Sequence, residues 1–241
     1  MMDDKDINCA VCGVIKKACR FPDGKGPTSC PTETQKQLID KMLPEYDTVE
    51  LAEFAKQASI QEGECYAYRD REPFIMHPCK SRLEETIEFA QKMKFKRIGI
   101  AFCGGVTAEA AMLTEILKKH DFDVIAVSCK VGAVPKERIG LRDDQKVRIG
   151  SFEPMCNPIC QAEILNRQNV DFTIALNLCV GHDSLFLKYF KGLMTVFSVK
   201  DRVTGHNPMV ALYTAHSYYQ RLKKLVFGSD EEIKSRLTAR K

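Results

Sequence analysis

Four cysteines lie within the first thirty residues, at positions that suit a metal site. Cys9 and Cys12 form a C-x2-C pair, in which a tight turn can direct both sulfurs at one ion, and Cys19 and Cys30 complete the set. Four thiolates suit a tetrahedral zinc ion or a four-iron cluster, and the spacing does not choose between them. The alternative is a disordered leader with scattered thiols. We favour a metal site, because a Gly/Pro-rich segment with few apolar residues needs a metal to fold.

A second group of cysteines follows three apolar segments that read as strands. Cys103, Cys129 and Cys179 are each followed by a glycine within three residues. If the strands are parallel, these cysteines meet at one edge of the sheet, where α/β proteins bind ligands. Cys156, which directly precedes an Asn-Pro helix start, would complete a second quartet. The alternative for each is a small buried packing residue, the commonest role of a cysteine in an apolar strand.

Polar residues follow the same predicted strands. Histidine can bind a metal or move protons, and lysine or arginine can offset the charge of a thiolate-bound cluster or hold an anionic substrate. Loop solubility or helix capping is the alternative role for each of them. Our candidate catalytic residues are His182, Asp183, Lys130 and His206, and our candidate cofactor-binding residues are Lys200 and Arg202.

Three cysteines share neither pattern. We interpret Cys65 and Cys79 as shielded thiols, and Cys160, inside the helix that Asn157-Pro158 begins, as a packed side chain or a reserve ligand. No Walker loop or Gly-x-Gly-x-x-Gly motif is present. We therefore infer no nucleotide.

The elements that position these residues alternate between buried strands and helices. Predicted strands cover 97–103, 122–129, 170–179 and 193–199, and predicted helices cover 107–120 and 184–190 and begin at Asn157-Pro158 and Asn207-Pro208. This alternation predicts an α/β fold with a doubly wound, Rossmann-like, mostly parallel sheet. The irregular segment 130–155 has the length of a lid or a site loop.

The first third of the chain is predicted to be helical. Capping-box spacings at Thr32 with Gln35, and at Asp47 with Glu50, predict helices near 33 and 48. The same spacing from Ser81 to Glu84 predicts a helix that ends near 93, and a further box at Ser229 predicts a short terminal helix. We expect three parts: a cysteine-rich metal-binding appendage (1–31), a helical segment (32–94) and the α/β domain (95–241).

Composition excludes several classes of protein. The net charge of +4 is spread over 68 charged residues without a basic cluster, which does not indicate nucleic-acid binding. No apolar run approaches the ~20 residues of a membrane span, and the start lacks the features of a signal peptide. We expect a cytoplasmic protein whose eleven cysteines stay reduced. The sequence does not fix the oligomeric state.

Several long motifs carry a family resemblance. They are Gly99-Ile-Ala-Phe-Cys103, Cys129-Lys-Val-Gly-Ala-Val-Pro-Lys136, Cys156-Asn-Pro158, Leu178-Cys-Val-Gly-His-Asp-Ser184 and Val199-Lys-Asp-Arg-Val-Thr-Gly-His-Asn-Pro208. The chain resembles the uncharacterised bacterial and archaeal family catalogued as domain of unknown function eighteen forty-seven, often labelled metal-binding. The resemblance implies a cysteine-rich metal protein, common in anaerobes, without an assigned reaction. It supports both quartets and implies that position 160 need not be cysteine.

Our leading hypothesis is an iron–sulfur protein with one or two 4Fe–4S clusters and a redox or cluster-assisted catalytic role. Its partner would be a small-molecule substrate or an electron-transfer partner. One alternative is a non-enzymatic metal- or anion-binding protein with structural zinc at its amino end. A weaker alternative is a sulfur-handling enzyme with a cysteine nucleophile beside His182 or Lys130.

Overall fold

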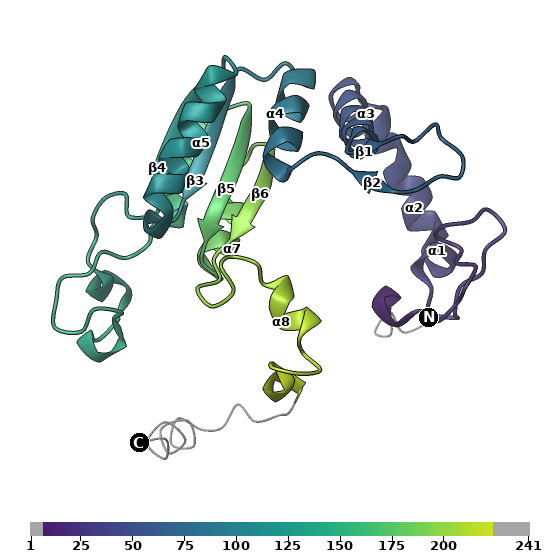
Figure 1. Ribbon diagram of the computed structural model, residues 1–241. Helices are drawn as coiled ribbons and strands as arrows, with labels where there is room; N and C mark the ends of the chain where they lie inside the picture. Colours follow the sequence, from purple (N-terminus) through teal and green to yellow (C-terminus); the bar gives the residue numbers. More distant parts are fainter. Residues whose placement is uncertain (1–6, 224–241) are drawn as a thin grey trace. The chain divides into compact units, whose positions relative to one another are not determined.

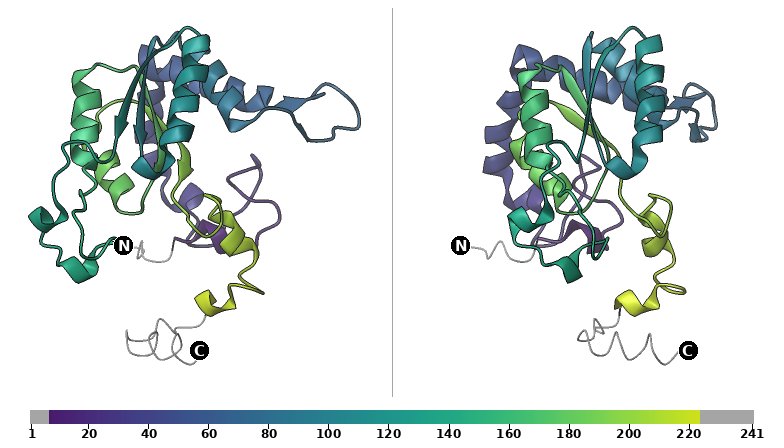
Figure 2. Two further views of the ribbon diagram at one scale, coloured as in Figure 1. Left: turned by 60° about the vertical axis from the view of Figure 1, so that its left-hand side comes forward. Right: turned by 90° about the vertical axis from the view of Figure 1, so that its left-hand side faces the viewer.

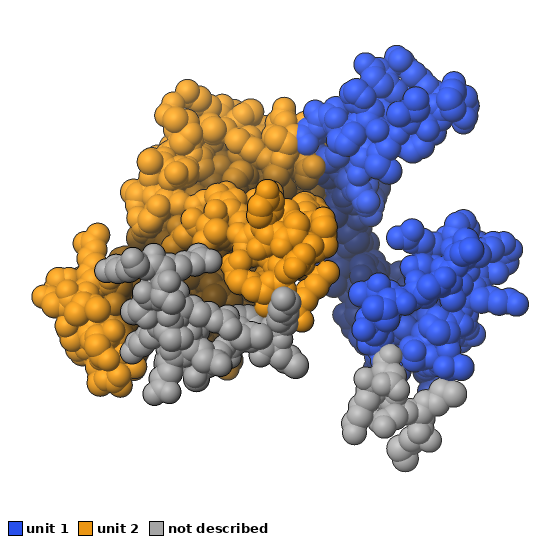
Figure 3. Space-filling model, turned by 60° about the horizontal axis from the view of Figure 1, so that its bottom comes forward, with its two compact units in different colours: residues 1–80 blue, residues 81–241 orange. Residues whose placement is uncertain are grey.

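A four-stranded parallel sheet lies at the centre of the second of two structural units. The computed structural model describes residues 7–223 (Figure 1). The chain divides into two units, with the boundary between Lys80 and Ser81 (Figure 3). The strands are β3 (Arg97–Phe102), β4 (Asp123–Ser128), β5 (Phe172–Leu178) and β6 (Met194–Val199). Their order is β4-β3-β5-β6, with every pair parallel. The predicted parallel α/β fold is therefore confirmed, with each strand bound within two residues of its expected position.

Helices cover both faces of this sheet (Figure 2). One face packs against α4 (Arg82–Lys92) and α5 (Thr107–Lys119), and the other against α6 (Pro158–Arg167) and α7 (His182–Tyr189). Alternate residues of β3 supply the two cores, because side chains of a strand point to opposite faces in turn. Ile100 lies in the first core and Ala101 in the second. All seven residues of β5 are buried, as expected of a central strand covered on both sides.

The strand order places a topological switch point between β3 and β5. From β3 the chain crosses through α5 to β4, whereas β5 pairs with the other edge of β3 and continues through α7 to β6. Crossovers on opposite faces leave a crevice outside the carboxyl ends of these two strands. Any ligand site of the domain is expected there.

The segment between β4 and α6 is irregular, as predicted, and is fastened by ion pairs. It contains two short turns of 3₁₀ helix, Lys136–Ile139 and Asp143–Gln145. Lys136 pairs with Glu153 at 2.7 Å, and both side chains are largely shielded from solvent. Lys146 Nζ is bound by Glu137, Asp143 and the carbonyl of Ser151.

The first unit is helical but has almost no core. Among residues 7–80, Gln61 is the one buried residue. Its helices are α1 (Pro31–Thr34), α2 (Lys36–Met42) and α3 (Val49–Glu64), followed by an antiparallel hairpin of β1 (Tyr66–Ala67) and β2 (His77–Pro78). A short 3₁₀ turn, Cys9–Val11, precedes them, and another, Leu43–Asp47, joins α2 to α3.

Two predicted helix caps are confirmed. Ser81 and Glu84 satisfy each other's backbone amides at the start of α4. The side chain of Asn157 accepts a hydrogen bond from the amide of Cys160 at the start of α6, and Pro158 is the first helical residue. These two sites fix the entry of the chain into both layers.

Three other predicted caps are wrong by one or two residues. Cys30, rather than Thr32, precedes α1, because Pro31 is pre-set for the first helical position. Thr48, rather than Asp47, precedes α3, since Asp47 belongs to the preceding 3₁₀ turn. Pro208, rather than Asn207, precedes α8 (Met209–Tyr213). The helix expected from Ser229 lies outside the described residues.

No helix within residues 7–223 combines the length and the apolarity that crossing a bilayer requires.

Candidate functional site

Four cysteines from four separate segments gather at the carboxyl edge of the sheet. Cys103, Cys129 and Cys179 directly follow β3, β4 and β5, and Cys156 directly precedes the cap of α6. Cys129 is 2% exposed and Cys103 is 9% exposed, while the other two are half-buried. Cys129 lies in the middle, because its thiol is a hydrogen-bond partner of both Cys103 and Cys156. We call these four residues the sheet-edge cysteines.

Backbone amides of the turn after β3 donate to two of these sulfurs. The amide of Gly104 lies 3.3 Å from Cys129 Sγ, and the amide of Gly105 is hydrogen-bonded to Cys103. A Cβ placed on Gly105 would lie 3.5 Å from Lys200 Nζ and 3.9 Å from Cys103 Sγ. The Lys200 ammonium group and the Cys103 sulfur therefore both lie close to Gly105, which is exposed.

Basic side chains donate to the other two sulfurs. Arg202 Nη2 lies 3.4 Å from Cys179 Sγ, and His182 is hydrogen-bonded to Cys156. Nitrogen donors thus lie beside all four sulfurs, and such donors favour the thiolate form, because the negative sulfur is a far better acceptor than a neutral thiol.

These hydrogen bonds separate the pKa values of the four thiols. The bond with Cys129 lowers the pKa of Cys103 to about 5. Bonds with Cys129 and then His182 lower the pKa of Cys156 to about 4. The pKa of Cys129 is raised, since its proton is shared with both neighbours, and burial raises the pKa of Cys179. The bond to Cys156 also raises the pKa of His182, so an ion pair between these two side chains is favoured.

The other predicted polar residues make contacts that hold the backbone. Lys130 Nζ donates to the carbonyl of Pro154 at 2.6 Å. The carboxylate of Asp183 accepts from the amide of Ser184, in the first turn of α7. His206 Nδ1 accepts from the amide of Asp201, which closes the turn that carries Arg202. Of the six predicted polar residues, His182, Lys200 and Arg202 are thus the ones beside the sulfurs, with Lys130 acting on Cys156 through its charge.

A buried glutamine, which the sequence analysis did not single out, ties the site together. Gln161 of α6 is fully buried, and its Nε2 donates to the carbonyl of Val127 at 2.8 Å and to that of Phe102 at 3.2 Å. These carbonyls are at the ends of β4 and β3, just before Cys129 and Cys103. The sequence signal that could have identified Gln161 is a polar residue on the apolar side of an amphipathic helix.

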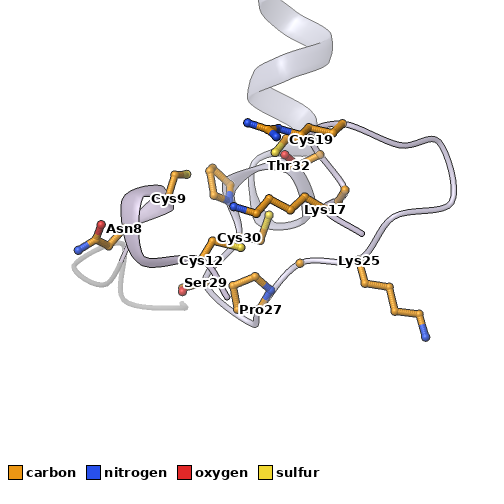
Figure 4. A pocket seen from close by; sticks show the side chains of 14 residues that line it. Asn8, Cys9, Cys12, Lys17, Cys19, Lys25, Pro27, Ser29, Cys30 and Thr32 are labelled. Carbon is orange, nitrogen blue, oxygen red and sulfur yellow. The ribbon is translucent and has the colours of Figure 1, made fainter. Parts of the chain in front are cut away.

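The amino-terminal quartet lines one open pocket of about 240 Å³ in the first unit (Figure 4). Cys9, Cys12, Cys19 and Cys30 all belong to its lining. Irregular chain holds them, closed by backbone hydrogen bonds such as that from the Ala18 amide to the Lys25 carbonyl. The four cysteines thus line one pocket on a segment without a core, and the metal site that the sequence predicts there stays a prediction.

The side chains of the two quartets are not arranged as the ligands of a metal ion. Within residues 7–223, no three Cys, His, Asp or Glu side chains are grouped so that they could hold a metal ion as they stand. Ligation at either quartet would therefore require side chains to turn toward a common point. The donor chemistry still fits a thiolate-bound metal, because each quartet offers four sulfurs and none of these eight cysteines forms a disulfide.

Comparison with known proteins identifies relatives but no reaction. The sequence model of the family described as "Protein of unknown function (DUF1847)" matches residues 30–197. An uncharacterised protein of Methanocaldococcus jannaschii is 46% identical over 196 residues, which cover 81% of this chain and 92% of that protein. No solved structure matches this chain.

Proposed function

The chain belongs to this family of proteins of unknown function, and from its sheet-edge cysteines we propose that it carries a thiolate-bound metal centre, an iron–sulfur cluster, with a redox or cluster-assisted role on a small molecule. Cys103, Cys129, Cys156 and Cys179 would be the ligands. A bound cluster would supply a centre that exchanges single electrons beside a bound small molecule.

One observation supports the proposal above the others: nitrogen donors lie at the sheet-edge sulfurs. The Gly104 amide donates to Cys129 Sγ and Arg202 donates to Cys179 Sγ, while Lys200 and His182 act on the pKa values of Cys103 and Cys156. Hydrogen bonds to the ligand sulfurs and nearby positive charge set the reduction potential of such clusters. The contrast with Cys79 supports this assignment, because its thiol instead donates to the carbonyl of Cys65.

Basic side chains of the site have two roles in the proposal. Lys200 beside Cys103 and Arg202 beside Cys179 would offset the negative charge of four thiolates, which costs much free energy when buried unpaired. His182, held by Cys156, is placed to move a proton at that edge. The amino-terminal quartet would hold a second cluster or a zinc ion, in a supporting role.

The test compares Cys129→Ser with Cys160→Ser in the full chain, purified without oxygen. Cys160 is a matched control, because it is a half-buried cysteine of α6 whose amide, not its sulfur, binds the Asn157 cap. We expect about four irons and four sulfides per filled site, with a broad visible absorption. Cys129→Ser should remove the iron and sulfide of one site, and Cys160→Ser should remove neither.

Two results would contradict this function. Colourless protein that contains only zinc, or none of these metals, would exclude the iron–sulfur centre. Equal iron in the wild type and in Cys129→Ser would show that any cluster lies elsewhere.

A second candidate function rests on the contact between His182 and Cys156. A cysteine that interacts with a histidine, one residue before the cap of α6, has the surroundings of a nucleophile. In metal-free protein, iodoacetamide should then alkylate Cys156 well before Cys160, and His182→Ala should slow the reaction at Cys156. Equal rates at the two cysteines would exclude this candidate.

A further inference from the structure

Two cysteines outside both quartets stand opposite each other in the first unit. The β1–β2 hairpin pairs Ala67 with His77 and Tyr66 with Pro78, and the next residues in this register are Cys65 and Cys79. The amide of Cys79 donates to the carbonyl of Cys65 at 2.8 Å, which continues the ladder by one step. This pair closes the base of the hairpin.

Their spacing suits a disulfide. Cys65 lies at the helical end of α3, and its carbonyl accepts from the amide of Cys79 at 2.8 Å. Cys79 Sγ lies 3.3 Å from the same carbonyl, so this sulfur is next to the backbone of Cys65. A disulfide, which spans Cα separations of about 4.4 to 6.8 Å, would need the two side chains to turn toward each other.

The hydrogen bonds of these sulfurs identify them as thiols rather than ligands. Cys65 Sγ donates to the carbonyl of Gln61 at 3.0 Å, and Cys79 Sγ donates to the carbonyl of Cys65 at 3.3 Å. A sulfur that donates to a carbonyl carries its proton, whereas Cys129 and Cys179 accept from the Gly104 amide and from Arg202. Cys65 and Cys79 are thus chemically distinct from the sheet-edge cysteines.

Solvent reaches this pair. Cys79 is exposed, Cys65 is half-buried at the end of α3, and every residue of the loop from Tyr68 to Met76 is exposed. The ladder between them consists of two residue pairs, too few to be stable alone. A covalent link at its base would therefore decide how well the hairpin is ordered.

We propose that Cys65 and Cys79 form a dithiol site that exchanges with small disulfides, such as oxidised glutathione. Cys79, the more exposed, attacks first: its thiolate forms a bond to one glutathione sulfur and the other leaves as a thiolate. Cys65 then attacks the Cys79 sulfur and releases the second glutathione. Two electrons pass from the pair to the small disulfide, and its two thiolates take up the two cysteine protons.

The experiment maps disulfides in the full chain after equilibration with reduced and oxidised glutathione, followed by acid quench and mass spectrometry of peptides. In the wild type, a peptide linking Cys65 to Cys79 should appear and should disappear with excess reductant. Cys65→Ser should trap glutathione on Cys79, at about tenfold or more the level of the wild type, because the resolving thiol is gone. Cys160→Ser is the matched control and should form the link normally.

Several outcomes would overturn the proposal. Glutathione persisting on both cysteines of the wild type would show that the sulfurs cannot meet. A link from either cysteine to a third one, or no modification of Cys79 while other thiols oxidise, would do the same. The peptide map of the wild type shows whether Cys65 and Cys79 form a disulfide, so the test does not depend on any variant. Because this link does not involve the two quartets, the dithiol proposal and the iron–sulfur proposal can fail independently of each other.

Discussion

The two cysteine quartets contrast in what holds them. Three of the sheet-edge cysteines follow regular strands and the fourth precedes a capped helix; two of the four are buried, and nitrogen atoms donate to Cys129 and Cys179. The amino-terminal quartet lies on irregular chain around an open pocket, in a unit where, among residues 7–80, only Gln61 is buried. The fold builds the sheet-edge site, whereas the proposed metal would have to hold the amino-terminal quartet together.

The contrast also separates two kinds of dependence on metal. A buried core that exists without the cluster should keep the α/β domain folded when metal is removed. Residues 7–31 have no such support, so their structure should be lost with the metal. The following predictions test this difference, in order of expected effect.

The largest effect is expected at the amino-terminal quartet, from Gly26→Ala. A Cβ there would lie 2.5 Å from Cys30 Sγ, too close for any real contact, so the sulfur must move away from the pocket. We expect loss of the metal bound by this quartet, measured as metal per chain, with the sheet-edge site unchanged. Gly13→Ala is the matched control, because a Cβ there meets nothing within 4 Å. Equal metal content in the two variants would show that the pocket is not the site.

An intermediate effect is expected from Gln161→Leu in the sheet-edge site. The change removes two hydrogen bonds from a fully buried amide to the ends of β3 and β4. We expect a loss of about 1 to 3 kcal/mol in the free energy of unfolding, measured with urea on metal-free protein. Gln168→Leu, at the exposed end of the same helix, should change it by less than about 0.5 kcal/mol. If both variants unfold alike, Gln161 does not fasten the site.

The smallest effect is an expected loss of stability in the loop between Cys129 and Cys156 when the pH is lowered. The hydrogen bond from Lys136 lowers the pKa of Glu153 to about 2, against about 4.3 for an unfolded chain. The stability from this pair is therefore complete above about pH 5 and is lost as the pH falls through about 4 toward 2. Hydrogen exchange of the loop, corrected for intrinsic rates, should rise over that range. Glu153→Gln should show fast exchange at neutral pH and little further change.

Much of the α/β domain could be predicted from local pattern. Buried strands are short apolar runs, and the caps at Ser81 and Asn157 are determined by residues three positions apart or less. Parallel strands then bring cysteines after their ends together whatever the loops do, which is why the sheet-edge cysteines could be grouped in advance.

The remaining features depend on contacts between distant residues. Gln161 binds carbonyls some 34 and 59 positions away, and its residue type alone does not indicate those partners. His206 looked like a site residue but closes a local turn, since a histidine after a strand serves either purpose. The helices predicted to start near 33 and 48 begin at Pro31 and Val49, because proline and a preceding 3₁₀ turn outweighed the capping spacing.

The fastened ends of the loop after β4 have a consequence for evolution and engineering. Lys130 binds the carbonyl of Pro154, and the backbone of Val134 accepts from Met155, so the chain leaves and returns at nearly one point. Segments whose ends are clamped together can be lengthened, shortened or exchanged at small entropic cost. The stretch between these clamps is therefore a place where a foreign loop of different length can be grafted while Cys129 and Cys156 stay in place.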